Sequence, residues 1–168
     1  MIKIRSGIGY DIHRLVRGNG LMIGGVKVSD SLAAHAHSDG DVLIHSLIDA
    51  LLGAMGGQPD IGELFPDNDP AFKGIASSVL LNKVKQLLAG NNFEILNLDC
   101  VLVMEEPKIS PFKREIVKNI TNILGIPQSD FNLKAKSKEK LDAVGRGEAL
   151  ECFSMAMIRL QSKSTEGQ

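Results

Sequence analysis

A helical pattern over residues 42 to 52 is bounded at both ends by residues that start and stop helices. The segment from residue 38 to residue 41 supplies side chains that cap a helix N-terminus, and Gly53 follows the last apolar position. Apolar residues repeat at helical spacing along one face of the run. Three polar residues fall at i, i+4 and i+8 on another face: Asp41, His45 and Asp49. The sequence therefore predicts a helix with one face in the core and a polar stripe that lines a site.

Alternation of apolar and polar residues predicts strands on both sides of this helix. The expected strands cover residues 2–10, 95–104 and 132–137, with two very short strands about the turn Gly24–Gly25. Further helices are expected over residues 75–89 and 112–124. Residues 148–160 fit a helix or a strand on pattern alone, and we favour a strand. Residues 54–72 are rich in Gly, Pro and Asp and predict a long loop, a feature that is usually functional.

Length and charge limit what the chain is expected to bind. The 168 residues suit one domain, which we place at residues 1–161, and the polar tail at 162–168 is expected to be disordered. Nineteen basic and twenty acidic residues leave a net charge of -1, which favours a small-molecule ligand over nucleic acid or a membrane surface. We find no signal peptide or bilayer-spanning run, and Cys100 and Cys152 are interpreted as buried thiols. These features predict a cytoplasmic protein.

Asp11 and His13 lie at the end of the first predicted strand. Because side chains alternate along a strand, both point to the same face. With His45 they supply three oxygen and nitrogen ligands, the number that a catalytic zinc site typically holds beside one open position. An Asp-x-His pair is common by chance, however, and a lone helical histidine is more often packed or solvated than ligating. Spacing alone therefore favours a chance pair and a packed or solvated histidine over a metal site.

Three further segments have side chains suited to phosphate, each with a plain structural alternative. His37 and Ser38 precede the helix, whose N-terminal N–H groups can hold a phosphate oxygen, but capping alone accounts for Ser38. Residues 136–140 combine hydroxyl, cationic and carboxylate groups of the kind that bind a diphosphate with Mg²⁺, yet a solvated turn is equally expected. Residues 145–148 bring backbone close to the guanidinium of Arg146, and a tight turn explains the same glycines.

Six motifs follow one another along nearly the whole chain. They are Gly9-Tyr10-Asp11-Ile12-His13, Ala36-His37-Ser38-Asp39-Gly40-Asp41, His45, Asp60-Ile61-Gly62, Phe65-Pro66-Asp67-Asn68-Asp69-Pro70 and Gly145-Arg146-Gly147-Glu148. Together they closely resemble the 2-C-methyl-D-erythritol 2,4-cyclodiphosphate synthase family. The resemblance implies a single α+β domain, with a mixed β-sheet and helices packed on one face. It also implies a homotrimer whose active sites lie between subunits, so that a monomer is inactive.

The resemblance implies a phosphorus–oxygen lyase of non-mevalonate isoprenoid biosynthesis. The family converts 4-diphosphocytidyl-2-C-methyl-D-erythritol 2-phosphate to the 2,4-cyclodiphosphate and CMP, the substrate's own 2-phosphate attacking the β-phosphorus. No protein nucleophile is required, so positioning and electrostatics dominate. The implied cofactors are zinc at Asp11, His13 and His45, as Lewis acid and template, and Mg²⁺ or Mn²⁺ at Glu139. Transition-state stabilisation is assigned to His37 and Ser137.

The resemblance also implies substrate contacts, which fall into groups according to the part of the substrate that they would bind. Those around the first metal and the phosphate are Asp11, Ile12, His13, His37 and Ser38. Those beside the methylerythritol unit are Asp60, Ile61, Gly62, Phe65, Pro66, Asp67, Asn68 and Asp69. The cytidine pocket is Met104, Glu105, Glu106, Pro107, Lys108, Ile109 and Ser110; the diphosphate contacts are Lys136, Ser137, Lys138 and Glu139, with Ala143 and Arg146 as further contacts.

The chain departs from the family pattern at positions that bear on substrate affinity. These are an apparent extra residue at Gln58–Pro59, Ser137 in place of threonine, Lys136 and Lys138 in place of small polar residues, and Ala143 in place of an aromatic residue. Two other functions are weighed against the cyclase. One is a zinc-dependent phosphatase or cyclic-diphosphate hydrolase, in which water replaces the internal phosphate nucleophile. The other is a non-catalytic binding module with a structural metal.

Overall fold

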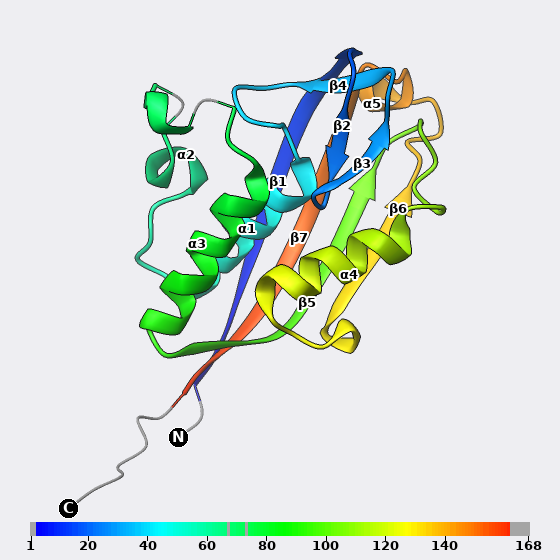
Figure 1. Cartoon of the computed structure of the whole chain (residues 1–168). Helices are drawn as coiled ribbons and strands as arrows, with labels where there is room; N and C mark the ends of the chain where they lie inside the picture. The colour runs from blue at the N-terminus through cyan, green and yellow to red at the C-terminus, as the bar shows by residue number, and fades with distance from the viewer. Residues whose placement is uncertain (1–2, 67, 73, 162–168) are drawn as a thin grey trace, which may run out of the picture.

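Five strands form one sheet, and the main helices pack on a single face of it (Figure 1). The computed structural model describes residues 3–66, 68–72 and 74–161, so that Asp67 and the predicted tail at 162–168 lie outside the described residues. Within these ranges the chain is one α+β domain, as the resemblance implied. None of the helices in the described ranges combines the length and apolarity that crossing a bilayer requires.

The elements follow the chain in a mixed order of strands and helices. The sheet contains β1 (Lys3–Arg17), β4 (Leu32–His35), β5 (Phe93–Val103), β6 (Phe131–Lys136) and β7 (Ala149–Leu160), in the order β4–β1–β7–β5–β6. A separate hairpin pairs β2 (Leu21–Ile23) with β3 (Val26–Ser29). The helices are α1 (Val42–Met55), α2 (Ile61–Leu64), α3 (Ser77–Gly90), α4 (Lys113–Leu124) and α5 (Asp142–Gly145), with 3-10 turns η1 (Pro70–Phe72) and η2 (Gln128–Asp130).

Strand β7 lies at the centre of the sheet and pairs antiparallel with β1 and β5. Strand β6 runs parallel to β5, which makes the sheet mixed as expected. Strand β4 pairs with β1 only from Arg14 to Arg17. Asp11 and His13 therefore lie on β1 immediately before this pairing begins, where one side of the strand is open to other parts of the chain.

Helix α1 packs unusually close to β1, because β1 has glycine where the two elements meet. A Cβ atom built on Gly9 would lie 2.0 Å from the carbonyl oxygen of Ser46, and one on Gly7 would lie 2.2 Å from that of Ala50. No side chain fits at these distances, so only glycine allows the contact. Eleven of the fourteen residues of α1 are buried, which makes it the central helix of the core. The close approach brings His45 of α1 to the strand that carries Asp11.

The start of α1 differs from the prediction in one respect. Asp41, not Ser38, is the N-cap, and its carboxylate accepts the backbone N–H of Ile44 at 3.1 Å. The same fully buried carboxylate accepts the N–H groups of Gly24 and Gly25 at 2.9 and 2.6 Å. Asp41 thus ties the hairpin turn to the helix. It does not belong to the polar stripe that lines the site.

The long loop predicted over residues 54–72 contains ordered structure. It folds into α2 and η1, and Asp60 caps α2 by accepting the N–H of Glu63 at 2.9 Å. Strand β4 and helix α5 were not predicted either. Each of these elements has three or four residues, too few to show a period in the sequence, and is set by its tertiary neighbours. The hairpin at Gly24–Gly25 and the final strand are confirmed.

The long helices α1, α3 and α4 leave the second face of the sheet uncovered, and among the described residues large apolar side chains are exposed there. Ile8, Tyr10 and Ile12 alternate along β1, and Ile8 is 83% exposed. On β7, Phe153 packs against Tyr10 with ring centroids 4.7 Å apart and is itself 47% exposed. An exposed apolar patch of this kind on a folded domain marks an interaction surface.

Candidate metal centre and its cavity

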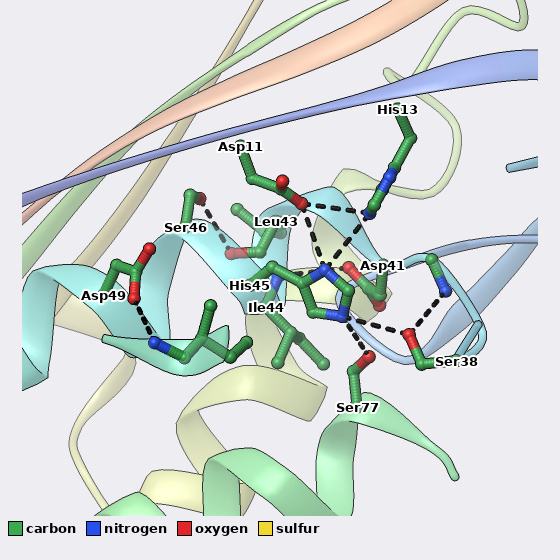
Figure 2. A network of polar contacts seen from close by, with 12 residues as sticks. Asp11, His13, Ser38, Asp41, Leu43, Ile44, His45, Ser46, Asp49 and Ser77 are labelled. Atoms are coloured by element: carbon green, nitrogen blue, oxygen red, sulfur yellow. Dashed lines mark hydrogen bonds and ion pairs between the residues drawn. The ribbon is translucent and has the colours of Figure 1, made fainter. Parts of the chain in front are cut away.

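Three ligand atoms come together at the N-terminal end of α1, from Asp11, His13 and His45 (Figure 2). The Oδ2 atom of Asp11 lies 3.1 Å from Nε2 of His13 and 3.0 Å from Nδ1 of His45. The two ring nitrogens are 3.1 Å apart. In a tetrahedral zinc site with bonds of about 2.0–2.1 Å, ligand atoms stand about 3.3 Å from one another. The triangle therefore has the donor set and nearly the size of a zinc site with one position open.

Hydrogen bonds alone do not account for this triangle. A carboxylate donates no proton, so each contact to Asp11 uses the hydrogen of a ring nitrogen. If both rings donate to Asp11, two N–H groups face each other across 3.1 Å. A cation among the three atoms satisfies all of them at once. Among the described residues, this is the one cluster of three or more His, Cys, Asp or Glu side chains with ligand atoms close enough for a metal.

Charge within the cluster shifts the pKa values of its members. Burial raises the pKa of Asp11, but hydrogen bonds from His13 and His45 outweigh it and lower the pKa to about 2. Burial lowers the pKa of His45, but the hydrogen bond and charge of Asp11 outweigh it and raise the pKa above its ordinary value. Asp11 is therefore an anion throughout the physiological range, as a metal ligand must be.

The opposite edge of the His45 ring has its own partners (Figure 2). Nε2 lies 2.9 Å from the hydroxyl oxygen of Ser77 and 3.3 Å from that of Ser38. Ser77 is fully buried, and both its hydroxyl and its backbone N–H donate to the carboxylate of Asp39. Sequence reasoning missed Ser77, because nothing in the pattern near residue 77 points to the metal.

A cavity of about 350 Å³ opens in front of the three ligands. Its lining brings together many of the residues predicted around the metal and the methylerythritol unit: Asp11, His13, His37, Ser38, His45, Ile61, Gly62 and Phe65. The apolar part of the wall includes Phe65 and Phe72, whose rings meet edge to face with centroids 5.5 Å apart. His37 and Ser38 thus line the same cavity as the predicted metal ligands.

Asp49 fixes the segment that forms the far wall of this cavity. Its Oδ1 atom accepts the backbone N–H of Ile61 at 2.9 Å, one helical turn below His45. Burial raises the pKa of Asp49 above its ordinary value, while the Ile61 amide opposes this shift. Of the predicted polar stripe on α1, His45 therefore lines the site itself, and Asp49 supports its wall through Ile61.

The segments predicted to bind cytidine and diphosphate lie together elsewhere in the chain. Glu105 joins them, because its carboxylate accepts the backbone N–H groups of Lys138 and Lys140 at 2.9 and 3.3 Å. Hydrogen bonds from this loop, that of the Lys140 amide first, hold the pKa of Glu105 below its usual range. The described residues that line the 350 Å³ cavity include none from 104–110 or 136–139. One chain thus presents the two halves of the predicted site separately.

Side chains in the predicted diphosphate loop pair within the chain. The Ser137 hydroxyl donates to Glu139, and the ammonium group of Lys138 donates to the buried carboxylate of Glu151. Glu151 also accepts the hydroxyl of Tyr10 at 3.0 Å, a partner that the sequence did not reveal. The hydrogen bond to Glu151 raises the pKa of Lys138. The extra positive charge predicted beside the diphosphate is thus largely offset at Lys138.

Ala143 and Arg146 follow this loop in the chain, and Lys108 and Ile109 belong to the cytidine segment that Glu105 joins to it. Arg146 donates from Nε and an Nη atom to the two carboxylate oxygens of Glu148, at 2.9 and 3.0 Å. Ala143 packs with Val144 in a small apolar cluster at the end of β5. Ile109 is 3% exposed, and Lys108 donates to the carbonyl of Glu105 at 3.1 Å.

A hollow of about 680 Å³ lies apart from the metal ligands, along the open edge of β1. Its lining is largely apolar and includes Ile8, Tyr10 and Phe153 of the uncovered sheet face, together with the carboxylates Asp49, Asp60 and Asp99. It is larger than the metal cavity, but its carboxylates are not part of the cluster of converging ligand atoms. We place the reactive site at the metal ligands because, in the part of the chain that the structure describes, ligand atoms converge only there.

The chain is similar to known proteins over nearly its whole length. Residues 4–159 match the YgbB family. A Treponema denticola protein named 2-C-methyl-D-erythritol 2,4-cyclodiphosphate synthase is 47% identical over 155 residues, which cover 92% of this chain and 96% of that protein. A chloroplastic Arabidopsis thaliana protein of the same name is 44% identical over 157 residues, covering 94% of this chain and 68% of that protein.

The likeness extends to solved structures. A complex of IspF from Plasmodium falciparum with CDP superimposes with a TM-score of 0.83 at 37% identity, over 95% of this chain and 97% of that chain.

Proposed function

The chain belongs to the YgbB family of 2-C-methyl-D-erythritol 2,4-cyclodiphosphate synthases, and we propose from this premise that it carries out their cyclisation. The proposed substrate is 4-diphosphocytidyl-2-C-methyl-D-erythritol 2-phosphate, and the products are the 2,4-cyclodiphosphate and CMP, in non-mevalonate isoprenoid biosynthesis. The observation that carries the proposal is the Asp11–His13–His45 triangle at the mouth of a cavity lined by His37 and Ser38.

Zinc is the metal that this donor set fits best. One carboxylate oxygen and two imidazole nitrogens, mutually 3.0–3.1 Å apart, suit its ligand preference and size. When bound, zinc supplies a Lewis acid that polarises the β-phosphate. Glu139 would contribute one carboxylate to Mg²⁺ or Mn²⁺, ions that complete their shells with phosphate oxygens and water in sites of this kind.

The reaction needs no nucleophile from the protein. An oxygen of the substrate's 2-phosphate forms a bond to the β-phosphorus while the bond from that phosphorus to the bridging oxygen breaks. The bridging oxygen leaves with the electron pair as part of CMP. The residues of the chain act by holding the reacting groups in line and stabilising charge. His37 and Ser137 are the proposed transition-state contacts, with Ser38 beside the phosphate.

The two halves of the site lead us to propose that it is completed between subunits of a homotrimer. The metal cavity includes no described residue from the predicted cytidine and diphosphate segments. The uncovered sheet face exposes Ile8, Tyr10, Ile12 and Phe153, an apolar surface suited to burial against another copy. The cytidine pocket would then face the metal ligands of a neighbouring chain. A cytoplasmic location stays a prediction.

Product analysis by ³¹P NMR tests the proposed reaction. The purified protein with zinc and Mg²⁺ is expected to yield CMP and cyclic diphosphate in equal amounts, without inorganic phosphate. Phosphate as the main product would instead support the hydrolase. His45→Ala is the matched control: it should abolish turnover while the protein stays folded. If removing the ligand unfolds the chain and the wild type makes no product, the binding module with a structural metal is supported.

A further inference from the structure

We propose that Asp39 and Ser77 form a positioning pair that orients His45 for the metal and sets the affinity of the site for zinc. The inference rests on the proposed zinc site and is independent of which reaction that site supports. Neither residue touches the triangle of ligand atoms. Both act through the far edge of one ligand ring.

The His45 ring is held from two sides. Its Nδ1 atom faces Asp11 and His13, at 3.0 and 3.1 Å, and its Nε2 atom faces Ser77 at 2.9 Å. Figure 2 shows the ring between these two sets of partners. Because the nitrogens lie on different edges of the ring, a partner at Nε2 fixes the direction in which Nδ1 points.

The order of donors and acceptors behind His45 is determined by Asp39. A carboxylate only accepts, so the hydroxyl hydrogen of Ser77 is directed to Asp39. The oxygen of Ser77 is then left to accept, and the group that donates to it is the Nε2–H of His45. In a neutral imidazole with its hydrogen on Nε2, Nδ1 carries the lone pair that binds a metal. The pair thus selects the ligating tautomer.

The position of the pair is itself fixed. Asp39 accepts the backbone N–H of Ser77 at 2.9 Å in addition to its hydroxyl, so both polar groups of Ser77 bind one carboxylate. Asp39 also accepts the N–H of Asp41, the N-cap of α1, at 3.3 Å. These bonds join the first residue of α3 to the segment that begins the His45 helix.

Ser38 is a weaker alternative partner for the same nitrogen. Its hydroxyl oxygen lies 3.3 Å from Nε2, against 2.9 Å for Ser77, and it accepts the N–H of Gly40 at 3.2 Å. Ser38 also lines the cavity, where it is proposed to meet the phosphate. Ser77 is fully buried and is therefore the partner that remains when substrate enters.

Zinc affinity measured by competition with a chromophoric chelator tests the proposal. Ser77→Ala removes the acceptor of Nε2–H and is expected to weaken zinc binding about 10–100-fold, the usual effect of losing such a partner. Ser77→Thr keeps the hydroxyl and should restore the affinity. Asp39→Asn loses the charge that orients Ser77 and should also weaken binding.

Ser46→Ala is the matched control. Ser46 is another fully buried serine, next to His45 on α1, but its hydroxyl bonds the carbonyl of Leu43 and the hydroxyl of Ser154. The same truncation there should cost stability and leave zinc affinity unchanged. Equal weakening in both variants would mean a general loss of packing and would overturn the proposal.

The remaining outcomes separate this inference from the proposed function. If the wild type binds zinc and Ser77→Ala binds it as tightly, the positioning pair is wrong and the metal site stands. If the wild type binds no zinc, the metal site itself fails. Should Ser77→Ala not fold, Asp39→Asn decides: wild-type affinity in that variant contradicts the proposal, and weaker binding supports it.

The ¹⁵N chemical shifts of the His45 ring give a second test. In the zinc-loaded wild type they should show the hydrogen on Nε2, and a hydrogen on Nδ1 would overturn the proposal.

Discussion

Individual residues place the ligand atoms, and two kinds of residue do this work. The first kind was visible in the sequence: Asp11 and His13 share a strand face, and His45 lies on a polar stripe of a helix. The second kind was not, because Ser77 and Asp39 meet only through folding, 38 positions apart in the chain. The role of Gly7 and Gly9 was not visible either, since a pattern of apolar and polar residues does not reveal how closely two backbones approach.

Gly9→Ala should separate the metal ligands without touching any of them. The added Cβ would lie 2.0 Å from a backbone oxygen of α1, so β1 must move away and carry Asp11 and His13 from His45. Overpacking of this kind costs about 1–3 kcal/mol or more. Thermal unfolding should show lower stability, and zinc affinity should fall. Gly90→Ala is the control, because nothing lies within 4 Å of its new Cβ, and both quantities should be retained.

At the scale of elements, long periodic segments were predicted and short ones were not. Helix α1 and the hairpin follow directly from capping residues, spacing and a Gly–Gly turn. Strand β7 was ambiguous because apolar residues stand next to one another at 152–153 and 155–158, which removes the alternation that identifies a strand. Helix α2 has four residues and is held by its N-cap Asp60 and by Asp49 of α1. Its structure therefore depends on a contact with another helix, which the sequence of α2 alone does not reveal.

Asp49→Ala should loosen the α2 wall of the cavity. The substitution removes the acceptor of the Ile61 amide, a bond worth about 1 kcal/mol. Hydrogen exchange at Ile61 should become faster, and KM should rise more than kcat falls, because the substrate wall is less ordered. Asp49→Asn keeps an oxygen acceptor and should behave nearly as the wild type. Equal effects of the two substitutions would show that charge, and not the bond to Ile61, is what matters.

Glu105 should make the order of the 136–140 loop depend on pH. Its folded-state pKa lies below the ordinary value, so its stabilising contribution is complete above about pH 4.3 and is lost as pH falls through the folded-state pKa. Exchange protection of the Lys138 and Lys140 amides, corrected for intrinsic rates, should stay constant above about pH 4.3 and decline as the pH falls below that value. In Glu105→Gln the protection should be lower and no longer change with pH. The same decline in that variant would contradict this role.

At the scale of the whole molecule, the fold leaves one sheet face uncovered by the long helices and keeps the two halves of the predicted site apart. Composition and charge did not predict this, because an apolar residue that alternates on a strand has the same pattern whether a helix or a second chain covers it. The resemblance implied a trimer, and the exposed face supports that proposal.

Ile8→Asp should dissociate the proposed trimer. Ile8 is 83% exposed in the single chain, so the substitution should cost a monomer little, whereas burying the carboxylate between subunits is unfavourable. Native mass spectrometry should show monomers that retain the fold and lack turnover. Val79→Asp is the control, since Val79 is an exposed apolar residue on α3, on the helical side, and its variant should remain trimeric. A trimeric, active Ile8→Asp protein would place the interface elsewhere.

A metal titration followed by CMP release tests most directly the claim that one zinc at Asp11, His13 and His45 supports the cyclisation. Metal-free protein, supplied with Mg²⁺ and substrate, should be inactive and should gain activity in proportion to added zinc until one equivalent per chain is bound. His45→Ala, folded by circular dichroism, should stay inactive throughout. Full turnover by the metal-free protein, or by His45→Ala, would contradict the claim.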